Sequence, residues 1–335
     1  ISMDEIMQMY VYIPRYKYQL FNAEDGKSVE QAINITFESK TTAKSTGTKN
    51  GEWLTHPAFT FGDTELAGIW VGKFETSNTK ELPKIVPNVS SLRSMKVSAQ
   101  FNTSRLMTTT LASTYGTSTN DDSHMMKNME WGAVAYLSSS IYGRYTNAST
   151  CIESGCEVWI NNNSSYTTGC AGSSVSESTN YHDSICNAWN TVTGVNASTT
   201  GNIYGIYDMS GGAWEYVMGV QKDSNGNVQV GSSGFSTSSL PDSKYYDLYD
   251  YQAEDGVGYT RYHLGDATRE VLKNTSSQGG NAWWSDYSYN IFSSEPWVIR
   301  GGNYNDGSRA GVFAFNHYNA GGWTIYSFRS VLSAG

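Results

Sequence analysis

The C-terminal stretch from Trp297 to Leu332 is the feature that most constrains how this chain can fold. An Arg-Gly-Gly turn at residues 300–302 opens it, and a Phe-Arg strand at residues 328–329 closes it. Between these ends, the run from Phe315 to Tyr326 fits neither the period of a core strand nor that of a helix. The fold must therefore hold an irregular segment between two fixed ends.

This segment also has the composition of a binding loop. It mixes Tyr, Trp and His with Asn, Ser and Gly. Tyr and Trp supply contact area at a low cost in conformational entropy, and the small polar residues adapt their hydrogen bonds to a partner. We therefore predict that residues 300–332 form a ligand-recognition surface.

The composition of the whole chain favours a loop-rich protein. Only 16% of the 335 residues are charged, whereas there are 33 Gly, 24 Tyr and 10 Trp. Low Leu content argues against a helical bundle, and abundant Tyr, Trp, Ser and Asn are more typical of an extracellular or virion protein than of a cytosolic enzyme. The net charge of −9 argues against nucleic acid as a partner, because a general nucleic-acid binder needs a basic face.

No part of the sequence predicts direct insertion into a membrane. No apolar run reaches membrane-spanning length, and no signal peptide is visible. The first residue is Ile1 rather than Met, so we expect an upstream segment, which could carry a signal or an anchor. The sequence leaves the oligomeric state open.

Four cysteines lie together in a polar insert at residues 145–200: Cys151, Cys156, Cys170 and Cys186. An even number of cysteines in a loop with little apolar content indicates two disulfides. Three connectivities are possible, of which we favour Cys151 with Cys156 and Cys170 with Cys186. A zinc site is the alternative, but the spacing does not suit structural zinc and only His182 lies nearby.

The first ninety residues read as a β-rich region, either a module of its own or part of the main domain. Alternation predicts strands at residues 10–13 and 16–18, and Pro14 predicts a break or a sheet edge between them. Residues 33–37 are expected to complete an early hairpin. Residues 56–61 and 68–75 are expected to form another strand pair.

Two helices are predicted in the middle third of the chain. The first covers residues 98–113. The second is capped by residues 120–123, continues through Met125, Met129 and Ala133 at helical spacing, and ends near residues 138–140. Short strands before and after the two helices favour an α+β domain over a repeating βαβ pattern.

Four short motifs occur along the chain in an order that is informative when they are taken together. They are Asn-Met-Glu-Trp at 128–131, Gly-Ile-Tyr-Asp-Met-Ser-Gly-Gly-Ala-Trp-Glu-Tyr at 205–216, Val-Ile-Arg-Gly-Gly-Asn-Tyr at 298–304, and Phe-Arg at 328–329. Together they resemble the C-type-lectin-like fold in its formylglycine-generating-enzyme branch. The resemblance implies a C-type-lectin-like domain over residues 91–335, with short strands, two main helices and long loop inserts, preceded by the β-rich region 1–90.

The same resemblance raises an enzymatic alternative, a metal-dependent oxidase of the formylglycine-generating type. Sulfatase-activating members carry a reactive Cys pair shortly after the Arg-Gly-Gly turn, whereas residues 303–335 here contain no Cys. The five His residues are scattered, with no i, i+4 pair for a ferrous site. We therefore expect a protein that is not an enzyme.

We expect no cofactor, although the resemblance also suggests calcium at the turn that carries Trp214 and Glu215. Gly212 stands where the resembled enzymes have Asn, which removes one oxygen ligand. The favoured alternative is structural, with Trp214 in the core and Glu215 capping a helix or pairing with an Arg. Arg300 and Arg329 are expected to form buried ion pairs, with Glu130 as a partner.

A closer resemblance is to the variable proteins of diversity-generating retroelements, which use this fold to display a rewritten C-terminal segment. Residues 301–315 look like the Gly-Gly-Asn-Tyr…Ala-Gly-Val-Phe frame of that class, and residues 328–332 look like its constant end. Val312, Phe313, Phe315, Phe328, Val331 and Leu332 are expected to anchor the segment in the core.

The resemblance implies that side chains between these anchors face solvent and bind a protein or a glycan on a target surface, as in an adhesin or a phage tail protein. The protein would then lie outside the cell, on a bacterial surface or a phage virion. The candidate ligand-binding residues are Tyr304, Asp306, Arg309, Asn316, His317, Tyr318, Asn319, Trp323, Ile325 and Tyr326.

Overall fold

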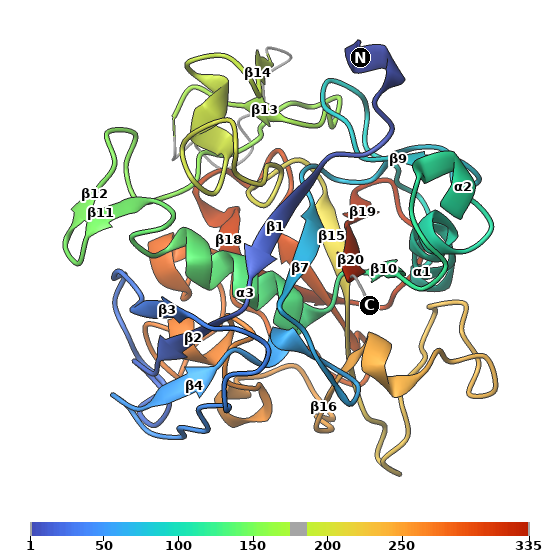
Figure 1. The fold of residues 1–335 in the computed structure, drawn as a ribbon. Helices are drawn as coiled ribbons and strands as arrows, with labels where there is room; N and C mark the ends of the chain where they lie inside the picture. The colour runs from blue at the N-terminus through green and yellow to red at the C-terminus, as the bar shows by residue number, and fades with distance from the viewer. Residues whose placement is uncertain (1, 175–185, 334–335) are drawn as a thin grey trace.

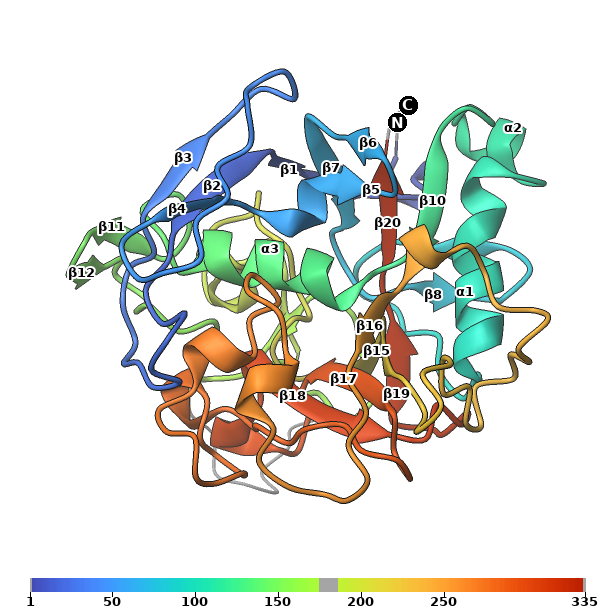
Figure 2. The same cartoon turned by 90° about the horizontal axis from the view of Figure 1, so that it is seen from below.

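A computed structural model describes residues 2–174 and 186–333, and Figure 1 shows it as a ribbon. Strands outnumber helices, in a mixed arrangement compatible with the expected α+β class. Two sheets organise the chain, and α3 (Asn128–Ser138) lies between them (Figure 2).

The first of these sheets joins the two ends of the chain. Its four strands are antiparallel and have the order β1-β7-β20-β10. The last strand therefore lies between an N-terminal strand and a central one, as Figure 1 shows by the red β20 beside the blue β7. The strands are β1 (Tyr10–Pro14), β7 (Gly68–Gly72), β20 (Ser330–Ser333) and β10 (Asp122–Met125).

The second sheet has five strands and contains most of the C-terminal segment. Its main path is β16-β15-β17-β18. β19 lies off this path and pairs with residues 214–216 of β15, whereas β16 pairs with residues 219–221 of the same strand. The strands are β15 (Trp214–Gln221), β16 (Asp247–Tyr249), β17 (Trp297–Gly301), β18 (Gly311–Tyr318) and β19 (Tyr326–Phe328). All eight residues of β15 are buried, so this strand forms the centre of the second layer.

α3 is buried on nearly its whole circumference, because both layers pack against it. All of its residues except Leu137 are buried. On one side, Tyr16 OH donates to Ala133 O at 2.7 Å, and on the other, Trp131 Nε1 donates to Val312 O at 2.8 Å. A helix in this position needs apolar or small residues on every face rather than one apolar stripe.

The predicted N-terminal strands are present, with one difference in pairing. β2 (Tyr16–Gln19) forms a sheet with β3 (Ile35–Phe37) and β4 (Trp53–Thr55), as the early hairpin required. The expected pair between residues 56–61 and 68–75 is wrong. β5 (Thr60–Phe61) pairs with β6 (Thr64–Glu65) instead, because Gly62, at φ 60°, allows a two-residue hairpin turn.

The prediction of the second helix was wrong at its beginning. Residues 122–125 form β10, and the helix starts only at Asn128. Pairing of β10 with β20 from the end of the chain outweighs the local capping signal. The first predicted helix is interrupted: α1 (Val97–Arg105) continues as a 3-10 turn over 106–108, and α2 (Ala112–Tyr115) follows.

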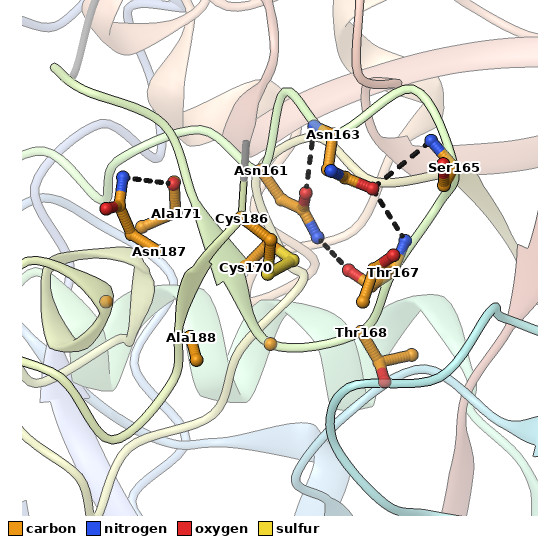
Figure 3. Close-up of a disulfide and its surroundings, with 12 residues drawn as sticks. Asn161, Asn163, Ser165, Thr167, Thr168, Cys170, Ala171, Cys186, Asn187 and Ala188 are labelled. Carbon is orange, nitrogen blue, oxygen red and sulfur yellow. Dashed lines mark hydrogen bonds between the residues drawn. A yellow bond between two sulfur atoms is a disulfide. The ribbon is translucent and has the colours of Figure 1, made fainter. Parts of the chain in front are cut away.

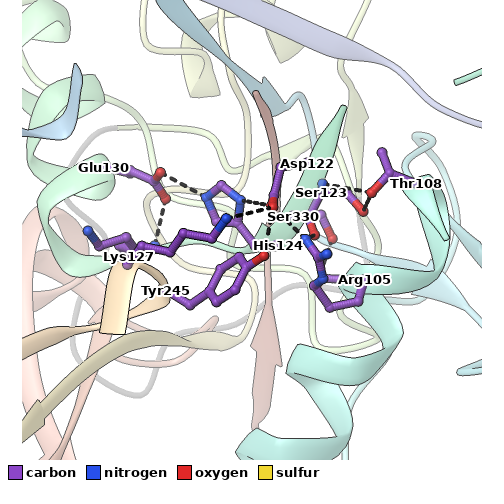
Figure 4. A network of polar contacts seen from close by, with 11 residues as sticks. Arg105, Thr108, Asp122, Ser123, His124, Lys127, Glu130, Tyr245 and Ser330 are labelled. Atoms are coloured by element: carbon purple, nitrogen blue, oxygen red, sulfur yellow. Dashed lines mark hydrogen bonds and ion pairs between the residues drawn. The ribbon is translucent and has the colours of Figure 1, made fainter. Parts of the chain in front are cut away.

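A buried polar network holds β10 to α3 and α1, and Figure 4 shows it at close range. His124 lies between two carboxylates, with Nδ1 3.0 Å from Asp122 and Nε2 2.9 Å from Glu130. Arg105 donates to Asp122 at 2.6 Å, and so does Tyr245 OH. Glu130 thus pairs with His124, and the expectation that it pairs with Arg300 or Arg329 is wrong.

The cysteine-bearing insert is held by two disulfides, which confirms both predicted pairs. Cys151 bonds Cys156, and Cys170 bonds Cys186, with the Cα atoms 4.9 Å apart in each pair. The second disulfide closes the pair formed by β13 (Cys170–Ala171) and β14 (Asn187–Ala188), as Figure 3 shows. The remaining short strands are β8 (Ser77–Asn78), β9 (Pro83–Lys84), β11 (Tyr145–Asn147) and β12 (Thr150–Cys151).

Candidate ligand-binding surface

The candidate segment begins and ends in strands of both sheets. β18 extends to Tyr318, so the expectation that no strand follows Phe315 is wrong for residues 315–318. Its pairing with β17 places Tyr318 opposite Trp297 and Asn316 opposite Ile299. Residues 319–325 are irregular and lead into β19. The candidate segment is therefore a strand followed by a loop that is fixed at both ends.

The Arg-Gly-Gly turn requires its glycines. Gly301 and Gly302 have φ of 88° and 77°, which side chains rarely adopt. A Cβ on Gly302 would lie 2.6 Å from Ala310 Cα, and one on Gly301 would lie 3.3 Å from the Trp131 ring. The turn can thus pack against α3 and against the start of β18 only without side chains.

A fully buried ion pair fixes the other end of the segment. Arg329 Nη2 lies 2.5 Å from Glu215 Oε1, and Arg329 also donates to Gly72 O at 2.7 Å and Tyr207 O at 2.9 Å. Trp214, beside Glu215, is 4% exposed. Trp214 is therefore part of the core, and Glu215 pairs with an Arg.

Arg300 is buried without a matching carboxylate. In the described parts of the chain, no acidic side chain lies within ion-pair distance of it, so the expected ion pair is wrong for this residue. It donates to Ala267 O at 3.1 Å and lies 5.5 Å from the Trp131 ring centre. Burial lowers the pKa of Arg300 to about 10, although Asp266 opposes that shift.

The core anchors predicted around the segment are in place. Val312, Phe313, Phe315, Phe328 and Val331 are buried, and Leu332 is half-buried. The ten candidate ligand-binding residues differ in exposure. Two are exposed, Arg309 and Trp323, whereas seven are half-buried: Tyr304, Asp306, Asn316, His317, Tyr318, Asn319 and Ile325.

Tyr326 does not face solvent, and the expectation that it does is wrong. It is 4% exposed, because β19 lies beside the buried strand β15, opposite Trp214. Its ring centre is 4.9 Å from that of Tyr216. Tyr326 therefore supports the surface from below.

Tyr318 connects this support to the solvent. Its ring centre lies 4.8 Å from that of Tyr326 and 6.2 Å from that of Trp323. Trp323 is 53% exposed. These three rings contact one another in a row from the core to the surface, with ring planes tilted by 50° between Tyr318 and Tyr326 and edge-on at 86° between Tyr318 and Trp323, and we call them the aromatic stack.

His317 lies in a second group of rings. Its Nδ1 contacts Glu295 Oε2, and its ring centre lies 5.0 Å from Phe292 and 6.0 Å from Tyr289. Tyr287 continues this group, 5.8 Å from Tyr289.

Arg309 and Tyr304 add contacts on two further sides of the segment. The Arg309 guanidinium lies 5.4 Å from the Tyr287 ring centre. Tyr304 packs edge-on against Tyr166 at 4.9 Å. The Arg93 guanidinium covers the same Tyr166 ring at 3.8 Å and donates to Thr324 O.

Asp306 brings a titratable group to this region. Asn303 N–H donates to its Oδ2 at 2.8 Å. Burial nevertheless raises the pKa of Asp306 to about 6, against the hydrogen bonds from Asn303 and Trp214. The charge of the surface therefore changes in mildly acidic solution.

Several residues of this surface were not predicted from the sequence. Tyr287, Tyr289 and Phe292 lie in the loop before β17, and Arg93 and Tyr166 lie far earlier in the chain. The loops at 162–167 and 285–290 have the same Asn, Ser and Tyr composition as the C-terminal segment. That composition could have identified both as extensions of the binding surface.

A cavity of 630 Å³ is lined by residues of segments 3–6, 77–90 and 189–190. Of the residues that the structure describes, no three His, Cys, Asp or Glu side chains are grouped to hold a metal ion. His182 lies outside the described residues. Likewise, no helix in the described parts of the chain is both long and apolar enough to span a membrane.

Comparison of the sequence with protein-family models and with curated protein sequences gives no match.

Proposed function

We propose that this protein is a non-catalytic binding protein of the C-type-lectin-like class, in which the segment 300–332 contacts a protein or a glycan on a target surface. The aromatic stack carries the proposal. An exposed Trp323 ring rests on Tyr318, which rests on the buried Tyr326. Large aromatic side chains held by a rigid base are typical of binding hot spots.

The framework around the stack supports this proposal. The segment is fixed at one end by the Gly301–Gly302 turn and at the other by the buried pair of Arg329 with Glu215. Surface substitutions away from such anchors usually change stability little. The side chains between them can therefore vary while the fold is kept, as display of a diversified surface requires.

We further propose that the segment is diversified by a retroelement and that the protein acts outside the cell, on a bacterial surface or a virion. The two disulfides support an oxidising location, because such bonds persist mainly outside the cytosol. Sequencing the encoding locus tests the first part. It should contain a reverse transcriptase gene and an adenine-biased near-copy of the 3′ end; without them, the protein would be an undiversified adhesin.

A binding screen tests the proposed surface. The intact protein and a Tyr318→Ala/Trp323→Ala double variant are applied to a glycan array and to an array of bacterial surface proteins. Ligands of the intact protein should bind the double variant at least about tenfold more weakly, since hot-spot truncations cost about 2 kcal/mol or more.

A matched control uses an exposed aromatic residue elsewhere. Tyr204 is 75% exposed and lies outside the surface. Tyr204→Ala should leave binding unchanged. Equal binding by the double variant and the intact protein would place recognition at another part of the molecule.

A further inference from the structure

A second surface lies at the free edge of the four-stranded sheet, on the other side of α3 from β17–β19 (Figure 2). There, a cavity of 190 Å³ opens beside β1. Its lining consists of residues 11–13 of β1, residues 134, 137 and 138 of α3, Phe37, Tyr142, and the loop residues Thr199, Thr200 and Gly205. No charged side chain lines it. The cavity shares no residue with the candidate ligand-binding surface.

β1 offers unpaired backbone groups along this cavity. Within the sheet it pairs with β7 alone, so its other edge has no strand partner among the described residues. Lys73 N–H donates to Met9 O, and Arg15 N–H donates to Ala67 O. In an antiparallel register with these bonds, residues 11 and 13 bond β7, and the N–H and C=O of Tyr12 point away from it.

Two pairs of exposed rings flank the edge. Tyr12 and Trp70 lie 4.9 Å apart on the outer face of the sheet and are 38% and 40% exposed. Phe37 and Tyr142 lie 4.6 Å apart at the cavity and are 41% and 45% exposed. Clustered exposed apolar side chains of this kind mark interaction sites.

We propose that the edge of β1 binds an extended polypeptide segment of a partner protein, which adds a strand to the sheet and places one uncharged apolar side chain in the cavity. Unpaired N–H and C=O groups at a sheet edge are complementary to another strand. Side chains of that strand alternate between the two faces. Those opposite Val11 and Ile13 point toward α3 and the cavity, and the one between them meets the Tyr12–Trp70 pair.

The size and polarity of the cavity favour a single apolar side chain as its occupant. Small-molecule sites usually span about 300–1,000 Å³, so a cavity of 190 Å³ is better matched to a single side chain. A charged side chain would lose its hydration in a lining without countercharge, which is costly. The partner segment therefore carries an aliphatic or aromatic residue at this position, and it can bind while the ligand-binding surface stays accessible.

A display library of nine-residue peptides without charged residues, selected on the intact protein, provides the probe. Selected peptides should show apolar residues at alternate positions. Hydrogen exchange should be fast at the Tyr12 amide in the protein alone and at least tenfold slower with a selected peptide bound. Enrichment without such alternation, or unchanged exchange at Tyr12, would overturn the proposal.

Two substitutions of Tyr12 distinguish the contribution of its backbone N–H to binding from that of its aromatic ring. Tyr12→Pro removes the outward N–H but no hydrogen bond to β7, and proline is tolerated on edge strands. Tyr12→Ala keeps the N–H and removes the ring. Tyr12→Pro should weaken binding of a selected peptide at least about fivefold more than Tyr12→Ala, and equal affinities would contradict strand addition.

A third variant guards against misfolding of Tyr12→Pro. Thr200→Trp enlarges a side chain of the cavity lining and should also abolish binding, while circular dichroism stays unchanged. Sedimentation of the protein without peptide tests whether a second copy of the chain occupies this edge. A dimer whose Tyr12 amide is already protected without peptide would show that a second copy takes this edge, and would refute the proposal.

Discussion

Arg329 and Glu215 contact each other through two hydrogen bonds, of 2.5 and 3.2 Å, although they lie 114 positions apart in the sequence and neither side chain is exposed. The pair joins the junction between β19 and β20, where Arg329 lies, to the central strand β15. Burial raises the pKa of Glu215 to about 7, although Arg329 opposes that shift. The structure beneath the surface thus depends on one charge pair in the core.

Breaking this pair should strongly destabilise the fold. Arg329→Met leaves Glu215 buried without its partner, and we expect the free energy of unfolding to fall by about 3–5 kcal/mol. Urea denaturation followed by fluorescence measures this change. The double variant Arg329→Met/Glu215→Leu should lose less than Arg329→Met alone. A loss below about 1 kcal/mol in the single variant would be typical of a solvent-exposed pair instead.

The aromatic stack predicts opposite effects for its two ends. Trp323→Ala changes an exposed residue and should alter the free energy of unfolding by no more than about 0.5 kcal/mol. Tyr326→Ala removes a buried ring and should cost about 3–5 kcal/mol, by analogy with other large aromatic truncations in cores. Parallel urea titrations compare the two variants. Similar costs for both would show that Trp323 also packs as a core residue.

The two disulfides should contribute unequally to stability. Cys170–Cys186 closes a loop of 16 residues and Cys151–Cys156 one of 5. Loop-closure entropy predicts about 3 kcal/mol for the longer loop and about 2 kcal/mol for the shorter one. Urea titration of the two Cys→Ser double variants tests this order. Equal losses would mean that strain or unfolded-state structure dominates.

His124 should make stability depend on pH. Burial alone would lower its pKa, but the carboxylates of Glu130 and Asp122 outweigh burial and raise it above 6.5. The charged form is therefore favoured in the folded state, and its stabilisation is complete below about pH 6.5 and lost as pH rises through the folded pKa. Thermal unfolding from pH 6 to 9 should show this loss. His124→Gln should flatten the curve, and an unchanged slope would assign it to another group.

Asp306 should act in the same direction, but because its carboxylate is disfavoured in the folded state rather than because a cation is favoured. Its pKa is raised to about 6 by burial, so the carboxylate destabilises the folded state above its unfolded pKa, and stability increases as pH falls through about 6. Asp306→Asn should therefore stabilise the protein at pH 8 and have little effect at pH 4. Chemical denaturation at these two values measures the difference. Destabilisation at pH 8 would mean that the contact with Asn303 needs a charged acceptor.

Local signals in the sequence predicted the structural features that depend only on residues close together in the chain. The strands on both sides of Pro14 and the pairing of Cys170 with Cys186 follow from alternation, turn chemistry and cysteine spacing, and all are present. Composition marked residues 315–326 for recognition, and Trp323 is the most exposed large apolar residue there.

Features that depend on distant partners were not predictable from local patterns. Residues 122–125 have capping chemistry, yet they form a strand because β20 pairs with them. Tyr326 looked like a displayed residue, but β15 buries it. Tyr166 and Tyr287 reach the same surface from separate loops, and no sequence spacing connects them to Tyr304 or Arg309.

The place of β20 ties folding of the four-stranded sheet to the segment between β18 and β20. Because β20 lies between β7 and β10, the four-stranded sheet stays in two unjoined parts until β20 docks. Any combination of residues between β18 and β20 that prevents docking leaves two sheet edges and a buried helix unprotected at once. Substitutions in this segment are therefore compatible with the fold only where they still allow β20 to dock.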